Sequence, residues 1–118
     1  MMVRRLFGGA TPPQDDEIDV LEAQRKLAAG EAVLIDVREL DEWWSGHVAE
    51  ARHIPLGEFV ERLDEIPTAG EVLLFCRSGQ RSGMATKFMR QQGFERVWNV
   101  TGGVLAWDAR GLPLVTGE

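Results

Sequence analysis

The chain has 118 residues, 44% of them hydrophobic and 27% charged, with a formal net charge of −6. This length suits one domain with its own core, and this composition is ordinary for a globular protein. The acidic balance argues against nucleic-acid binding, and the absence of a long apolar run or of a secretory leader argues against a membrane role.

The chain has one cysteine and two histidines, and these numbers limit its chemistry. One cysteine forms no internal disulfide and leaves no second thiol for dithiol exchange, which fits a cytoplasmic location. Three such side chains do not make a metal cluster, so we expect neither a metal nor another cofactor. Composition does not fix the oligomeric state, for which a monomer is our working expectation.

The N-terminal part of the chain predicts an arm followed by strand and helix elements. Residues 1–16 lack periodicity and contain two glycines and two prolines, so we expect a flexible arm there and a single domain over residues 17–118. A very short strand begins at Ile18. A helix is expected over 20–29, capped by Asp19 and ended by Gly30.

Strands and helices alternate through the rest of the chain. The expected elements, in order, are a strand over 32–35, a helix over 40–45, a strand over 52–54, a helix over 56–66, a strand over 72–75, a helix over 82–92, a strand over 97–100 and a helix over 104–109. This pattern predicts an α/β fold with a mainly parallel five-stranded sheet and helices on both faces. Ligands of such sheets bind beyond the carboxyl ends of the strands.

Cys76 is expected at such an end, in the loop between the strand over 72–75 and the helix over 82–92. The N–H groups at a helix start lack intrahelical partners, so they stabilise a thiolate and attract an anion. Residues 72–94 contain four basic and no acidic side chains, in a chain whose total charge is −6. The loop therefore predicts a reactive cysteine with a small anionic substrate. The alternative is a buried structural cysteine.

Three stretches of the sequence resemble signatures of the rhodanese (sulfurtransferase) family. The first runs from Leu34-Ile35-Asp36-Val37-Arg38 through Glu42 and Gly46-His47-Val48 to His53-Ile54-Pro55-Leu56; the second is Cys76-Arg77-Ser78-Gly79-Gln80-Arg81-Ser82; the third is Gly102-Gly103-Val104 with Ala106-Trp107, Gly111 and Pro113. Residues 49–53 depart from the family's usual Gly-Ala-x-Asn. The resemblance implies a single-domain rhodanese whose Cys76 carries a transferable sulfur as a persulfide.

This resemblance implies a sulfurtransferase that moves a sulfane sulfur from a donor such as thiosulfate to cyanide, a small thiol or a sulfur-acceptor protein. Cys76 is the expected nucleophile, and the other loop residues are expected to bind the donor: Arg77, Ser78, Gly79, Gln80, Arg81 and Ser82. Of the two arginines, we expect Arg81 to contribute more to binding the anion. Asp36 and Arg38 could touch substrate, but a structural pair beside the loop is favoured.

Two other functions remain open from the sequence. A phosphatase or arsenate reductase has a related loop, His-Cys followed by five residues and Arg. Here Phe75 precedes Cys76, Arg81 comes one position too early, and Ser82 stands where that arginine would be. The second alternative is a non-catalytic module that carries or senses sulfur or binds a partner.

Overall fold

The computed structural model describes residues 16–118, so the expected arm lies outside the described residues except for Asp16. Five strands form one sheet in the order β1-β5-β4-β2-β3, and every strand pairing is parallel. The strands are β1 (Glu17–Ile18), β2 (Ala32–Asp36), β3 (Arg52–His53), β4 (Glu71–Phe75) and β5 (Val97–Val100). The fold predicted from the alternating elements, a parallel five-stranded α/β sheet, is confirmed.

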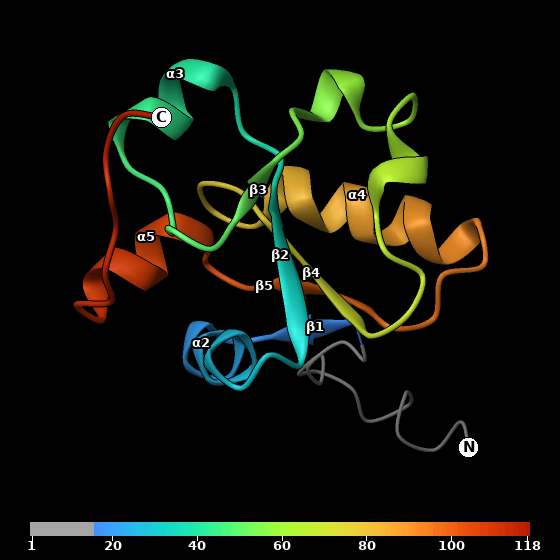
Figure 1. The fold of residues 1–118 in the computed structure, drawn as a ribbon, viewed down its shortest axis with the longest axis horizontal. Coiled ribbons are helices and arrows are strands. Elements are labelled where there is room, and N and C mark those ends of the chain that lie inside the picture. The colour runs from blue at the N-terminus through green and yellow to red at the C-terminus, as the bar shows by residue number, and fades with distance from the viewer. Residues whose placement is uncertain (1–15) are drawn as a thin grey trace, which may run out of the picture.

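Helices cover both faces of the sheet (Figure 1). They are α2 (Val20–Ala28), α3 (Leu40–Ser45), α4 (Gln80–Gln91) and α5 (Gly103–Ala109). Helices α2 and α5 pack on one face, where Val20, Ala23 and Trp107 are buried in the same apolar cluster. Helix α4 covers the other face through Ala85 and Met89.

The central strands are apolar without alternation because both of their faces are covered. In β4, Leu73 and Phe75 join the cluster under α2 and α5, whereas Val72 and Leu74 join the cluster under α4. All four side chains are at most 2% exposed. The sheet is therefore a rigid layer from which the loops at its carboxyl edge project. No helix among residues 16–118 is long and apolar enough to span a membrane.

The prediction of a helix over 56–66 is wrong. The structure has two short 3-10 helices there, Leu56–Glu58 and Leu63–Glu65. A segment between Pro55 and Pro67 with Gly57 in its first turn has little intrinsic helix stability. Instead it folds as tight turns that bury Phe59 and Ile66 and leave Val60 64% exposed.

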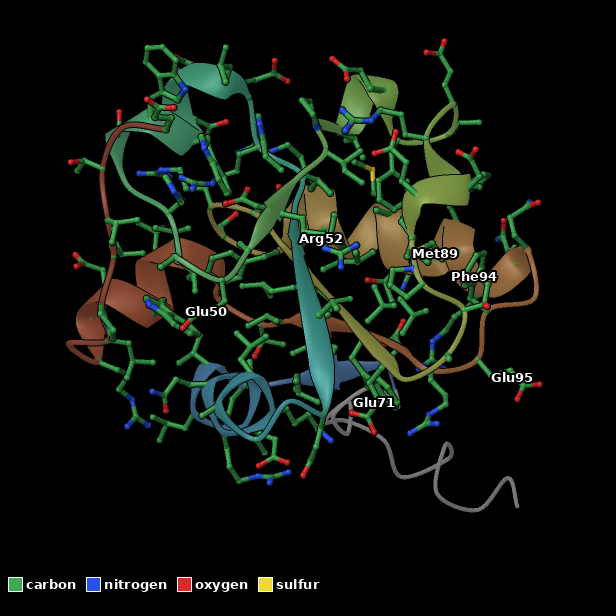
Figure 2. The ribbon with its side chains drawn as sticks, viewed as in Figure 1. Glu50, Arg52, Glu71, Met89, Phe94 and Glu95 are labelled. Atoms are coloured by element: carbon green, nitrogen blue, oxygen red, sulfur yellow. The ribbon has the colours of Figure 1, made fainter. Side chains whose placement is uncertain are left out.

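Helix α4 begins at Gln80, two residues earlier than predicted. Its buried residues are Ser82, Ala85, Thr86 and Met89, whereas the apolar Met84 is 59% exposed. The polar Ser82 and Thr86 are tolerated inside because their hydroxyls are hydrogen-bonded. At the other end, Gly93 is left-handed with φ 101°, and Phe94 lies beside Met89 (Figure 2).

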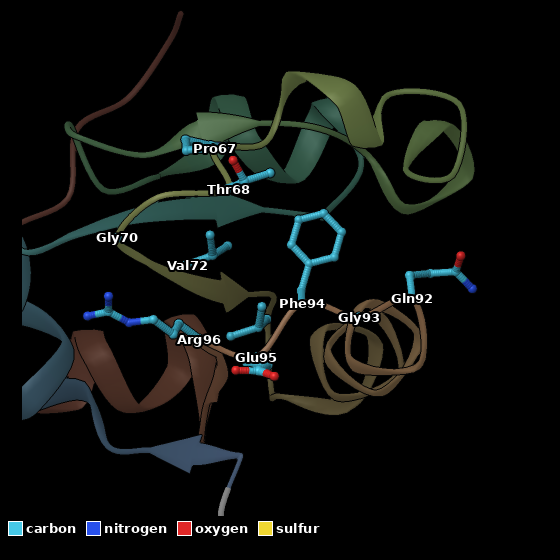
Figure 3. A pocket seen from close by; sticks show the side chains of 10 residues that line it. Pro67, Thr68, Gly70, Val72, Gln92, Gly93, Phe94, Glu95 and Arg96 are labelled. Atoms are coloured by element: carbon cyan, nitrogen blue, oxygen red, sulfur yellow. The ribbon is translucent and has the colours of Figure 1, made fainter.

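A pocket of about 390 Å³ lies where β4 and β5 begin (Figure 3). Its lining includes Val72, Phe94, Arg96 and Val97. Because parallel strands run the same way, this is the amino edge of the sheet, and Cys76 follows the opposite end of β4. The pocket therefore takes no part in the chemistry of the Cys76 loop.

Candidate active site

The carboxyl ends of three neighbouring strands bring together polar side chains from distant parts of the sequence. Cys76 follows β4, Asp36 ends β2, and Asn99 lies near the end of β5. All three are buried, with Asn99 6% exposed and the other two at most 1%. A cluster of buried polar groups at this edge is the position expected for a ligand site in a parallel sheet.

The loop after Cys76 curls so that its donors point at the sulfur. Gly79 is left-handed with φ 104°, a conformation that glycine adopts without a side-chain clash. The Gly79 N–H donates to Cys76 Sγ at 3.1 Å, the Ser82 N–H donates at 3.4 Å, and Ser82 Oγ lies 3.2 Å from the same sulfur. These groups, at the start of α4, form a cradle for a negatively charged sulfur.

The start of α5 holds the outer side of this loop. The N–H groups of Val104 and Leu105 donate to the carbonyls of Cys76 and Arg77 at 2.9 and 3.1 Å. Gly103 makes this approach feasible, because a Cβ at that position would overlap the Cys76 carbonyl oxygen. Gly103, part of the third sequence signature, thus allows α5 to support the loop.

The electrostatics of the cradle favour the thiolate. Burial by itself raises the pKa of Cys76, but the Ser82 hydroxyl and the N–H groups of Ser82, Gly79 and Ser78 outweigh burial, so the pKa lies below its ordinary value. A lowered pKa increases the thiolate fraction at neutral pH, and the thiolate is the nucleophile.

The Ser82 hydroxyl links the cysteine to Asn99, a residue that the sequence analysis did not identify. Ser82 Oγ donates to Asn99 Oδ1 at 2.6 Å, and Asn99 Nδ2 donates to the Gly79 carbonyl at 3.1 Å. The hydroxyl has one proton and two acceptors, the sulfur and the amide oxygen. It can turn toward Sγ when Cys76 is negatively charged and back to Asn99 when it is not. The sequence signal that could have identified Asn99 is its polarity, because the other residues of β5 are apolar.

Arg81 does not stand free in the loop. Its guanidinium makes two hydrogen bonds, at 2.7 and 2.9 Å, to the carboxylate of Glu42 on α3. Hydrogen bonding to this guanidinium lowers the pKa of Glu42 to about 2, so Glu42 is negatively charged at every pH at which the protein would be assayed. We expected Arg81 to bind the anionic substrate. In the structure its guanidinium instead binds the Glu42 carboxylate.

Asp36 and Arg38 form the structural pair that the sequence analysis favoured. Arg38 Nη2 donates to Asp36 Oδ2 at 2.8 Å, and both side chains are at most 5% exposed. The same guanidinium donates to the carbonyls of Glu42 and Gly46 at 3.1 and 2.7 Å. The pair therefore fixes α3 to the end of β2, which places Glu42 opposite the Cys76 loop.

The remaining predicted loop residues lie at the surface. Arg77, Ser78 and Gln80 are exposed, and Gln80 is the first residue of α4. The Ser78 N–H acts on the sulfur by lowering the pKa of Cys76. Among the described residues, the side chain that contacts Sγ is thus that of Ser82, which Asn99 holds in place, whereas the other hydrogen bonds to the sulfur come from the backbone.

The role of the Ser82 hydroxyl is testable by alkylation. Ser82→Ala removes a donor to the sulfur, which raises the pKa of Cys76 and reduces its thiolate fraction. We expect the iodoacetamide rate at about pH 6 to fall about tenfold, the effect of losing one hydrogen bond to a charged group. Thr86→Val is the matched control, because the Thr86 hydroxyl is buried on the same helix but donates to the Ser82 carbonyl. Equal rates for Ser82→Ala and the unaltered protein would contradict this assignment.

A buried cysteine with a lowered pKa, held by N–H groups at the carboxyl edge of a parallel sheet, is an arrangement suited to covalent chemistry on a sulfur atom or an anion. Comparison with known families is more specific: residues 19–110 match the rhodanese-like domain family. The chain belongs to this family, as the sequence signatures implied.

Relatives of known name support the same assignment. A sulfurtransferase of Allochromatium vinosum is 39% identical over 87% of this chain and 97% of its own length. The Bacillus subtilis protein YrkF, named as a candidate sulfur carrier, is 37% identical over 80% of this chain and 51% of its own length. A rhodanese-related protein of Thermoplasma volcanium superimposes with a TM-score of 0.78 at 27% identity, over 84% of this chain and 96% of its own length.

Proposed function

We propose that this protein is a sulfurtransferase that carries a sulfane sulfur on Cys76 as a persulfide. The observation that supports the proposal most strongly is the cradle itself: three donors lie within 3.4 Å of one sulfur atom whose pKa is lowered. Such donors stabilise negative charge on the sulfur before and after it reacts. The chain's own residues suffice for this chemistry, and the proposal requires no cofactor.

The reaction has two steps, and each conserves atoms and charge. The Cys76 thiolate attacks the outer sulfur of thiosulfate, the bond between the two donor sulfurs breaks, and sulfite leaves with its electron pair. The product is Cys76–S–S⁻, whose charge the N–H groups of residues 77–82 stabilise. A nucleophile such as cyanide then attacks the terminal sulfur, thiocyanate leaves, and the thiolate is restored.

The burial of Cys76 favours a donor whose reacting sulfur is a terminal atom. The residue is only 1% exposed, so the attacking sulfur lies at the bottom of the cradle. The outer sulfur of thiosulfate or of a persulfide is terminal and can enter. The phosphorus of a phosphate ester is surrounded by oxygens, and position 82 offers a serine instead of the arginine that would clamp them.

A sulfur-carrier role, in which the persulfide is delivered only to a partner protein, is the second candidate. YrkF, the Bacillus subtilis relative named as a candidate sulfur carrier, favours it. Both roles share the Cys76 persulfide and differ in the acceptor, which is a small nucleophile for the first and a thiol or acceptor protein for the second. We propose that either reaction takes place in the cytoplasm.

A direct assay separates these functions. The purified protein is incubated with thiosulfate and cyanide, and thiocyanate is measured; in parallel it is incubated with an aryl phosphate. We expect thiocyanate to form catalytically and the phosphate to remain at the background rate. Phosphate hydrolysis that depends on Cys76, without thiocyanate, would contradict the proposal. A stoichiometric uptake of sulfur without turnover to cyanide would favour the carrier role.

A further inference from the structure

The charges beside the Cys76 loop are largely cancelled in pairs. Arg81 binds Glu42 through two hydrogen bonds, and Arg38 binds Asp36. Within residues 16–118, Arg77 forms no ion pair with a carboxylate. Of these three arginines, Arg77 is thus the one without a carboxylate partner among residues 16–118, and its side chain is exposed.

Glu42 is held against Arg81 by more than the ion pair. Its Oε1 also accepts from the Glu39 N–H at 2.9 Å, as part of the capping box at the start of α3. Its backbone carbonyl accepts from Arg38 Nη1 at 3.1 Å. Because the carboxylate also caps its own helix, rotating it away from Arg81 would break the capping hydrogen bond as well as the ion pair.

The carboxylate also lies within electrostatic reach of the reacting sulfur. Arg81 directly precedes Ser82, whose N–H donates to Cys76 Sγ at 3.4 Å, so the Glu42–Arg81 pair lies beside the sulfur. The hydrogen bond to Glu42 raises the pKa of Arg81, and a negatively charged sulfur raises it further. The negative charge of Glu42 thus acts on the same region as the thiolate. Because Glu42 offsets Arg81, a thiosulfate dianion that approaches the Cys76 thiolate gains little attraction from Arg81, whereas a donor with a smaller negative charge needs less compensation.

We propose that Glu42 is a specificity-determining residue that favours sulfane-sulfur donors of low negative charge, such as organic persulfides, over the thiosulfate dianion. This inference rests on the proposed function. For a persulfide the step is balanced as follows: the Cys76 thiolate attacks the outer sulfur of R–S–SH, the donor S–S bond breaks, and RS⁻ leaves. Cys76–S–SH remains.

Two probes that differ by one charge test this selectivity. Thiosulfate is a dianion that releases sulfite, and methanethiosulfonate is a monoanion that releases methanesulfinate after the same attack on its terminal sulfur. The measured quantity is the ratio of kcat/KM for thiosulfate to kcat/KM for methanethiosulfonate, with cyanide as acceptor. The ratio removes effects that alter both donors equally, such as a loosened loop.

Glu42→Gln keeps the shape and an acceptor for the Glu39 N–H but removes the charge. We expect it to raise the donor ratio about tenfold, the size of a unit-charge interaction at about 6 Å with an effective dielectric constant of about 40. Asp41→Asn is the control, because it removes a charge from the same turn of α3 but leaves the Glu42–Arg81 pair intact. The donor ratio of this variant should stay within about twofold of that of the unaltered protein. In the double variant Glu42→Gln/Arg81→Gln both charges of the pair are gone, and the ratio should return toward the original value.

The dependence of thiosulfate turnover on salt supplies a second measurement of the same charge effect. If Glu42 offsets Arg81, thiosulfate turnover should change little with ionic strength, whereas Glu42→Gln should lose thiosulfate turnover as salt rises. A donor ratio unchanged by Glu42→Gln, or a steep loss of thiosulfate turnover with salt in the unaltered protein, would overturn the selectivity alone. Failure of the unaltered protein to use either donor would instead overturn the proposed function, and the selectivity with it.

Discussion

Cys76→Ser should abolish sulfur transfer. The hydroxyl that replaces the thiol is a far weaker nucleophile toward sulfur and cannot hold a persulfide, and no other cysteine exists in the chain to take its place. We expect thiocyanate formation to fall on the order of 10³-fold or more, as for removal of the nucleophile in other covalent enzymes. The measurement is thiocyanate release from thiosulfate and cyanide, at saturating concentrations of both.

The fold should survive this substitution, so the loss is attributable to chemistry. Serine is slightly smaller than cysteine and can accept the same hydrogen bonds from Gly79 and Ser82. Thermal unfolding of Cys76→Ser should therefore stay close to that of the unaltered protein. More than a tenth of the original turnover in a correctly folded Cys76→Ser protein would contradict the assigned nucleophile.

Asp36→Ala should cause a large loss of stability. It leaves the Arg38 guanidinium buried with two backbone carbonyls but without a counter-charge. Breaking a buried ion pair in this way typically costs ~3–5 kcal/mol. This is a large part of the about 5–15 kcal/mol by which a domain is stable. Urea unfolding should show the loss as a lower midpoint.

Glu58→Ala is the matched control for this prediction. Glu58 and Arg62 are also 2.8 Å apart, but their side chains are 54% and 34% exposed. Exposed pairs contribute about 0.2–1 kcal/mol, so Glu58→Ala should move the midpoint little. Similar midpoints for the two variants would show that burial of the Asp36–Arg38 pair does not determine its contribution.

Most of the fold could be predicted from the sequence because its signals are local. The runs that became β2 and β4 are apolar throughout, and the predicted cap Asp19 accepts from the Glu22 N–H at 2.9 Å. The segment 56–66 was predicted wrongly because apolar spacing suits a helix, whereas Gly57 and two flanking prolines favour tight turns. The exposure of Met84 follows from a tertiary requirement, since Ser82 must face the sulfur.

The candidate site was predictable only in part. The lone cysteine, the loop glycine and the helix start are local features, and they pointed to the loop in which N–H groups surround the sulfur. The Glu42–Arg81 pair joins residues 39 positions apart, and no local pattern indicates which charges will meet. Asn99 was missed for the same reason. It contacts Ser82 and Gly79, which are distant in the sequence, because its strand β5 lies beside β4.

Intact-mass analysis tests the central claim most directly. The reduced protein is treated with a sulfane donor, freed of excess reagent, weighed, treated with cyanide and weighed again. The account predicts a gain of the mass of one sulfur atom, located on the peptide that contains Cys76, and its complete loss as thiocyanate after cyanide. An unmodified Cys76 after treatment with both thiosulfate and methanethiosulfonate, or a sulfur atom that cyanide does not remove, would contradict it.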